Sequence, residues 1–392
     1  ILNEIIGMSS VSLISQSYGA GDLERTRTAI EQTLVFKALV ALAAGCIGFA
    51  VLRPLVGFFT SDPRAASSAL AYGRIRLLTL PLMFSSYTVN TALRNVGEAR
   101  KPMLIMGASA VLNVVLDPLF MFRRLPVVGL PGLGLGVFGA ALATVVSTGA
   151  AFLLGLGFLA SRRSRVPIRP RGLLRLHAQI DRQLITIGAP AGAEMLARHL
   201  AQAVVLKLAA LHGTAAVAAL GIVFRLFSFA FMPLVGLHMG GATVAGQNLG
   251  AEKLPRVHAT ARAALLVGLI AAATLSLAGW FLAWPLVRIF TSDAETLRAA
   301  VPLARVFCLV LVIVAVTFGL GTVFSGAGYT LPFLVSALLA KFGVQVPFLI
   351  LLRLVFGLPL TAVWLSFLAS ELTELVVVLL FYRAGRWKVV RV

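Results

Sequence analysis

The sequence predicts an all-helical membrane protein made of two similar bundles, and both its hydropathy and an internal repeat support that fold class. The chain has 392 residues, of which 59% are hydrophobic and only 12% are charged, and its mean hydropathy is +0.96. A helix that crosses a membrane needs about 20 mostly apolar residues. We therefore expect membrane spans at 27–52, 66–92, 102–122, 134–160, 184–211, 214–247, 257–290, 296–325, 331–355 and 359–383.

The repeat joins segments that lie 231 positions apart. "LVGFFTSDPRAA" begins at Leu55 and "LVRIFTSDAETL" begins at Leu286, and the same offset pairs Gly97 with Gly328. Self-similarity over so long a period indicates a duplicated structural unit. The offset covers six spans, an even number, so both copies enter the membrane in the same direction. We therefore expect a parallel repeat, related by a pseudo-two-fold axis along the membrane normal.

The repeat also predicts the domain boundaries: an N-terminal lobe at 1–161, a cytoplasmic linker at 162–182 and a C-terminal lobe at 183–392. Two spans precede the repeated motif in the second half, whereas the first half shows only the end of one. We therefore expect an intact protein of twelve spans whose first six-helix bundle is N-terminally incomplete here. The linker is rich in Arg and Pro, and we expect either a plain positive-inside connection or a segment that binds anionic lipid.

The net charge of +20 first raises the question of nucleic-acid binding. We reject it because the basic residues follow membrane topology: with the loop at 18–27 in the cytoplasm, that side holds 19 Lys and Arg residues and the outer side holds 7. The five His residues are scattered and no Walker loop is present, so we expect neither an enzyme nor an ATP-driven pump, and no cofactor. Membrane lipids and small molecules remain as partners.

Several motifs carry a resemblance to a known family. "GAGDLERTR" and "GQNLGAEKLPR" follow the second and eighth of the twelve spans. Between them lie, in this order, "LRNVGEARKPM", "LNVVLDPLFMF" and "GVFGAALATVVS", and "GRWK" lies near the end of the chain. In this order the chain resembles the multidrug and toxic compound extrusion (MATE) transporters. The resemblance implies a monomer in a prokaryotic plasma membrane, with two bundles in a V around a central cleft. It also implies antiport, in which H⁺ or Na⁺ drives export of lipophilic or cationic drugs or toxic metabolites by alternating access.

The candidate coupling site lies in "LNVVLDPLF" of the first half. A charge at the centre of a bilayer costs roughly 2.5–3.5 kcal/mol by insertion scales, so a carboxylate such as Asp117 needs a reason to be there. Asn113 lies one helical turn earlier on the same face, and Pro118 removes a backbone donor beside the acid. The resemblance implies that Asp117, Asn113 and Thr144 form a cation site, with Na⁺ at Asp117 and Asn113 as the one metal candidate. The alternative is that Asp117 stabilises a kink without changing its charge.

The second half holds the other three acids that we place within spans. Glu194 precedes Arg198 by one turn, and Glu371 and Glu374 share a face of the last span, with Lys341 as a partner for one of them. Arg225 lies among aromatic residues, where we expect it to pair across the cavity. These six residues form either internal ion pairs or a second site for the coupling ion or the substrate.

Two other functions stay open at this point. A lipid-linked oligosaccharide flippase of the same superfamily shares the bare architecture, but such a protein favours a cleft rich in Arg. A truncated, transport-inactive membrane protein is the third reading.

Overall fold

The computed structural model describes residues 2–125, 129–162, 164–352, 357, 360–390 and 392. Over these residues the chain is helical, and the one β-type contact is an isolated bridge between Arg124 and Pro131. The chain divides into two compact units, Leu2–Ile185 and Thr186–Val392, which are described separately below. The boundary between them falls within a helix, a few residues after the end of the expected linker.

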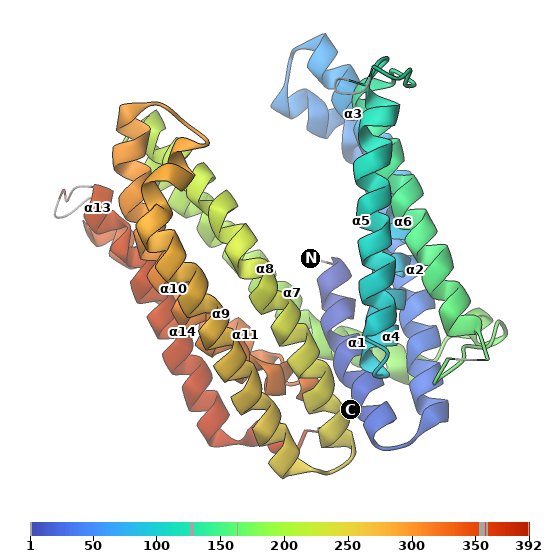
Figure 1. The fold of residues 1–392 in the computed structure, drawn as a ribbon. Helices are drawn as coiled ribbons and strands as arrows, with labels where there is room; N and C mark the ends of the chain where they lie inside the picture. Colours follow the sequence, from blue (N-terminus) through green and yellow to red (C-terminus); the bar gives the residue numbers. More distant parts are fainter. Residues whose placement is uncertain (1, 126–128, 163, 353–356, 358–359, 391) are drawn as a thin grey trace. The chain divides into compact units, whose positions relative to one another are not determined.

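In the described residues, the N-terminal unit contains helices α1 to α6, which Figure 1 labels, together with a short 3₁₀ turn and the first residues of α7. Helix α2 packs against α1 and α4, and α5 packs along α6. The elements are α1 (Leu2–Gly19), α2 (Leu23–Phe59), α3 (Pro63–Leu78), α4 (Leu80–Asn95), α5 (Arg100–Met121), α6 (Gly136–Ala160) and the 3₁₀ turn η1 (Gly172–Leu174).

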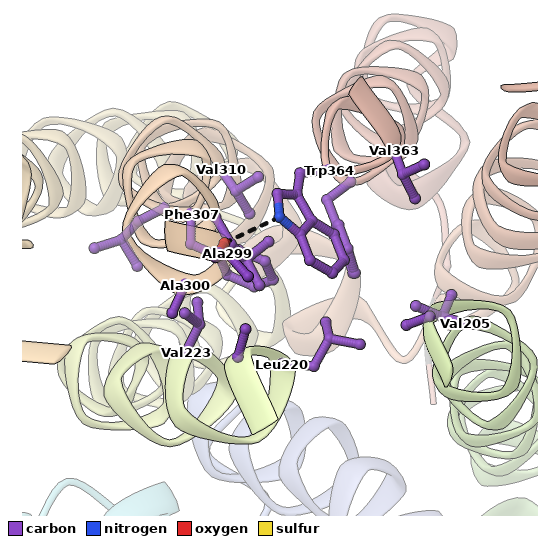
Figure 2. Packing of buried hydrophobic residues seen from close by; sticks show 14 of the residues in the cluster. Val205, Leu220, Val223, Ala299, Ala300, Phe307, Val310, Val363 and Trp364 are labelled. Carbon is purple, nitrogen blue, oxygen red and sulfur yellow. Dashed lines mark hydrogen bonds between the residues drawn. The ribbon is translucent and has the colours of Figure 1, made fainter. Parts of the chain in front are cut away.

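The C-terminal unit is organised around one central helix, α10, which packs against α8, α9 and α14. Its core includes Phe307, Leu220 and Trp364, whose indole Nε1 donates to the carbonyl of Ala299 at 3.2 Å (Figure 2). The elements are α7 (Ala178–Ala210), α8 (Thr214–Gly250), α9 (Leu254–Arg288), α10 (Ala294–Ala327), α11 (Leu331–Leu338), the π-helical segment η2 (Leu339–Gln345), α12 (Val346–Ile350), α13 (Leu360–Val363), α14 (Leu365–Ala384) and the 3₁₀ turn η4 (Arg386–Lys388).

Eight helices in the described part of the chain are long and apolar enough to cross a membrane. They begin at Leu23, Arg100, Gly136, Thr214, Leu254, Ala294, Leu331 and Leu365. The span that we expected at 66–92 is interrupted: α3 ends at Leu78 and α4 begins at Leu80. Pro81 stands in the first turn of α4, where its missing N–H costs nothing, so a new helix starts there. Part of the expected span 331–355, residues 353–355, lies outside the described residues.

The repeated "TSD" motif builds the same turn in both units. The backbone N–H of Asp62 donates to Thr60 Oγ1 at 3.2 Å, and that of Asp293 donates to Thr291 Oγ1 at 3.1 Å. Each aspartate then caps the next helix: Asp62 accepts from the N–H of Arg64 at 3.0 Å, and Asp293 accepts from that of Thr296 at 2.8 Å. The motif therefore recurs because both units need the same turn and helix start.

Backbone conformation follows the repeat as well. Gly97 and Gly328, which the offset pairs, have φ angles of 81° and 72° at the ends of α4 and α10. Gly21 has φ 79°, and its partner at the same offset is Glu252, with φ 57°. Among the described residues Glu252 is the one non-glycine with positive φ, a region in which a Cβ is unfavourable.

The linker is tied to the start of α2 by hydrogen bonds between side chains of α2 and main-chain atoms of the linker. Arg27 Nε donates to the carbonyl of Pro167 at 2.7 Å, and Glu31 Oε1 accepts from the N–H of Arg169 at 2.6 Å. Gln32 donates to the carbonyl of Arg175 at 2.6 Å. At Gly172 a Cβ would fall 1.8 Å from Glu31 Oε2, so any other residue there would require the Glu31 carboxylate to move. Contact between this linker and anionic lipid stays a prediction.

Candidate functional site

In the N-terminal unit, Asp117 and Asn113 lie together on α5. Asn113 Nδ2 donates to Asp117 Oδ1 at 3.4 Å, and both side chains are half-buried. Pro118 lies within α5 and has no N–H, so the carbonyl of Val114 has no donor from the helix. A carboxylate, an amide and a carbonyl without its helical partner therefore meet on one stretch of an apolar helix, which is the chemistry of a small cation site.

Thr144 is not part of that hydrogen-bonded pair. Its Oγ1 donates to the carbonyl of Ala140 at 3.0 Å, within α6. The two helices do pack together, and Ser109 Oγ of α5 donates to the carbonyl of Ser147 of α6 at 2.9 Å. The structure therefore brings together two of the three expected residues, and it leaves the hydroxyl of the third engaged by its own helix.

In the C-terminal unit, five charged side chains from three elements form one network. Arg198 of α7 pairs with both Glu194, one turn before it, and Glu374 of α14. Lys341 Nζ lies 2.7 Å from Glu371 Oε1 and 2.9 Å from Ser370 Oγ. The spacing of Glu194 and Arg198 predicts their pair, and Lys341 does pair with one of the two acids of the last span. The cross-helix bond from Arg198 to Glu374 has no sequence signal.

Two features of this network point to chemistry beyond packing. Three carboxylates meet two cations, and Glu374 Oε2 is buried without a hydrogen-bond partner. Lys341 lies in the π-helical segment η2, and such wide turns occur frequently at functional sites. The network can therefore take up one further proton or cation without creating an excess of positive charge.

Arg225 lies on α8 beside a hollow of about 420 Å³. The hollow is lined by Phe224, Arg225, Ser228, Phe229 and Met232. Phe229 and Met232 are 73% and 62% exposed, so the lining is open as well as apolar. A guanidinium in the middle of an apolar helix is costly against hydrocarbon, so this face of α8 fits a water-accessible surface. Pairing of Arg225 across a cavity stays a prediction.

Two further acids lie within helices of the N-terminal unit. Glu31 lies within α2 and Glu4 within α1, and Glu31 accepts a hydrogen bond from the linker. A base was missed too: Lys37 of α2 is fully buried, with its Nζ 4.5 Å from the centroid of the Tyr87 ring. The rule that intramembrane charges are functional candidates applies equally to bases, and "TLVFKALVAL" carries that signal.

Comparison with known proteins agrees with this architecture. The MatE family model matches residues 4–119 and 190–351. The probable multidrug resistance protein YoeA of Bacillus subtilis is 26% identical over 382 residues, which cover 96% of this chain and 81% of YoeA. The probable multidrug resistance protein NorM of Thermotoga maritima is 25% identical over 389 residues, covering 97% and 81%.

A solved structure shares the fold. The crystal structure of a MATE protein in the bent conformation aligns with a TM-score of 0.88 at 21% identity, covering 98% of this chain and 83% of that one. The family model covers most of the chain, and the solved structure shares its fold of two repeated helical bundles. This chain therefore belongs to the MATE family of multi-pass integral membrane proteins, which are transporters and not enzymes.

Proposed function

We propose that this protein is a cation-coupled antiporter that exports lipophilic small molecules, with Asp117 as the residue that binds the coupling ion. The names of the relatives, which are multidrug resistance proteins, support export of drug-like compounds. The observation that carries the coupling proposal is the carboxylate of Asp117 on apolar α5, 3.4 Å from Asn113 and one residue before Pro118.

Coupling needs a group whose charge changes during the cycle. A bound cation can shift a conformational equilibrium only through its different affinities for the two states. When Asp117 is neutral, α5 can hold it against apolar neighbours at little cost. When it is ionised, it favours a state in which water reaches it. Pro118 weakens the helix beside the carboxylate, so two arrangements of this segment differ little in backbone hydrogen bonding.

We favour H⁺ over Na⁺ as the coupling ion. Hard metal cations are held by several oxygen ligands at once. Among the described residues, Asp117 has one side-chain partner, the amide of Asn113, and the Thr144 hydroxyl donates to Ala140 instead. A proton needs only the carboxylate. Na⁺ coupling would require further oxygen ligands around Asp117, such as the oxygen of the Thr144 hydroxyl.

The hollow on α8 is our candidate for part of the substrate surface. Phe224, Phe229 and Met232 supply adaptable apolar contacts, which suit varied lipophilic compounds. Arg225 favours substrates that carry a negative charge or a hydrogen-bond acceptor, so we expect neutral and anionic lipophilic compounds to bind better than lipophilic cations there. A flippase for lipid-linked sugars would need several cations for phosphate, whereas the lining of this hollow supplies only Arg225.

The test is transport in proteoliposomes under an imposed pH gradient or an imposed Na⁺ gradient. Asp117→Asn keeps the shape and removes the charge, and we expect it to abolish gradient-driven export while substrate binding largely survives. Glu194→Gln is the matched control, because it neutralises an acid of similar burial in the other unit. If Glu194→Gln abolishes export and Asp117→Asn does not, the coupling site lies in the C-terminal network. A drive by Na⁺ alone would contradict our choice of ion.

A further inference from the structure

Lys37 is a buried base whose presence is explained neither by the packing of the fold nor by the proposed coupling site at Asp117. It lies on α2, it is fully buried, and its Nζ has no hydrogen-bond partner. Its nearest aromatic neighbours are Tyr87 and Phe84 of α4, with 4.5 Å and 6.0 Å between Nζ and the ring centroids. An ammonium held by ring faces alone has lost most of its hydration without gaining an anion, so its charged form is costly there.

An acid lies close to Lys37 but does not neutralise it by direct contact. A Cβ added at Gly7 of α1 would lie 3.7 Å from Lys37 Nζ, 3.9 Å from Glu4 Oε2 and 3.2 Å from Tyr87 Cε1. These three groups therefore surround the same space beside Gly7. No ion pair within 4.0 Å joins Lys37 to Glu4 in the described part of the chain. A gap of this kind between two polar groups is where a bridging water fits.

The charges beside this space indicate what it does not hold. The Glu4 carboxylate would repel a bound anion. A metal cation is disfavoured by the Lys37 ammonium. Water satisfies donors and acceptors alike, and through water a proton can pass between Lys37 and Glu4.

A polar route leads away from Lys37 along α4. Arg94 Nη2 donates to Thr91 Oγ1 at 3.4 Å, and Thr91 lies one turn after Tyr87. Tyr87, Thr91 and Arg94 follow one another at spacings of four and three residues, so they lie on one face of the helix. This face connects the buried base with the end of α4 that the charge distribution places toward the cytoplasm.

We propose that Lys37 is a proton-exchanging residue of the N-terminal unit, distinct from Asp117, with Glu4 as the group that receives its proton. In this step the Lys37 ammonium releases H⁺ to a water in the space beside Gly7, and the water passes H⁺ to the Glu4 carboxylate. Both residues end neutral, so no net charge is created in the membrane. The inference rests on the proposed proton coupling, because an ion-driven cycle is what gives a second exchanging group its use.

The charged and titratable groups around Lys37 come from each element that packs on this part of α2. Helix α1 contributes Glu4, and α4 contributes Tyr87 and, beyond it, Arg94. Helix α3 meets α2 farther along, where Leu77 lies against Gly45 and Gly48. The linker meets α2 nearer its start, at Glu31. Glu4 is therefore the acid that can balance or receive the proton.

The direct test is nitrogen NMR of protein labelled with ¹⁵N at the lysine side chains. The chain has six lysines, so the spectrum is small enough to assign by substitution. Loss of one signal in Lys37→Met identifies Lys37, and Lys207→Met, which removes an exposed lysine of α7, is the matched control. We expect the Lys37 signal to change between the ammonium and amine forms during a pH titration of the folded protein, and this change should persist in Lys207→Met. A Lys37 signal in one form throughout would overturn the proposal.

Transport gives the second test. Lys37→Arg keeps a cation that does not release its proton, so we expect export to lose part of its pH dependence while the variant remains folded. An unchanged pH profile in Lys37→Arg would contradict proton exchange at this position. The two proposals fail separately. If Asp117→Asn retains gradient-driven export, the coupling assignment is wrong, whereas the NMR titration of Lys37 needs no transport and still decides this inference.

Discussion

The two units carry a buried polar side chain at different positions of the repeat. Gly7 of α1 corresponds to His238 of α8 at the offset of 231, and Lys37 of α2 corresponds to Gly268 of α9. In one unit the long side chain comes from the second helix and the glycine from the first, and in the other unit the order is reversed. Tyr87 likewise corresponds to Phe318, so each polar group packs against an aromatic ring.

The two solutions differ in hydrogen bonding. One ring nitrogen of His238, Nδ1, lies 2.9 Å from the carbonyl of Phe318, and the other, Nε2, lies 3.0 Å from Ser325 Oγ. Lys37 Nζ has no such partner. The polar chemistry at these repeat positions therefore differs: protein groups hydrogen-bond His238 in the C-terminal unit, whereas no protein group among the described residues hydrogen-bonds Lys37 Nζ. At the same offset of 231, Asp117 corresponds to Phe348 and Lys341 corresponds to Ala110.

The largest effect that we expect concerns the partly buried charge network of the C-terminal unit, formed by Arg198, Glu194 and Glu374. Arg198→Met leaves Glu194 and Glu374 without their shared cation. Removal of one partner from a buried pair typically costs 3–5 kcal/mol; because 32% of the Arg198 side chain is exposed, we expect about 2–4 kcal/mol. Thermal or denaturant unfolding in detergent measures it. Asp117→Leu in the N-terminal unit should lower the free energy of unfolding by less than Arg198→Met does. An equal loss in the two variants would contradict this comparison of the units.

The next effect compares His238 with Lys37 directly. His238→Ala opens a cavity and leaves Ser325 Oγ without its partner, so we expect a loss of about 2–4 kcal/mol in the free energy of unfolding.

Lys37→Met should act in the opposite direction. It keeps the volume and removes an unsatisfied buried amine, so we expect a gain of about 1–2 kcal/mol in the free energy of unfolding. The same unfolding measurement applies. A loss of stability in Lys37→Met would show that the base is satisfied in the folded protein.

A smaller effect is expected at the paired positions Gly21 and Glu252, which both have positive φ. Glu252→Gly relieves the strain of a Cβ in the left-handed region and should stabilise the protein by roughly 0.5–1 kcal/mol. Gly21→Ala introduces that strain and should destabilise it by about 1 kcal/mol. If both substitutions change stability in the same direction, the two turns are not equivalent.

The smallest effect concerns the two helix caps and their pH dependence. Hydrogen bonds from the hydroxyl and the N–H of Thr296 lower the pKa of Asp293. A carboxyl with a lowered folded pKa contributes stability that is present above its unfolded pKa, about 3.9, and is lost as pH falls through the folded value. We therefore expect the stability difference between wild type and Asp293→Ala to shrink below about pH 4. Asp62→Ala should show a smaller difference, because Asp62 caps with one hydrogen bond.

Most of the fold could be predicted because hydropathy and the repeat report on whole helices. Two details could not. The break at Thr79 depends on Pro81, which also fits an unbroken membrane helix, and the π-helical segment around Lys341 depends on tertiary packing that no local pattern encodes.

The site was predictable where geometry is local. Spacings of four residues on a helix placed Asn113 beside Asp117 and Glu194 beside Arg198, because such residues are neighbours in any α-helix. The bond from Arg198 to Glu374 joins residues 176 positions apart, and the sequence has no signal for it. The role of Thr144 stays a prediction: a motif suggested it, and the structure shows only that its hydroxyl donates to Ala140 within α6.

The attachment of the linker to α2 has a consequence for how this protein can vary over evolution. Pro167, Arg169, Arg175 and His177 contribute main-chain atoms to it, whereas α2 contributes the side chains of Arg27, Glu31 and Gln32. Many residues supply the same main-chain atoms, so these bonds leave most of the linker free to accumulate substitutions while its path is preserved. Arg169 and Arg165 are exceptions, because their side chains hydrogen-bond to Glu24 and to Tyr18. Gly172 is another, since any side chain there would displace the Glu31 carboxylate. Drift in this segment is therefore constrained at these linker positions and at the α2 residues that bind them.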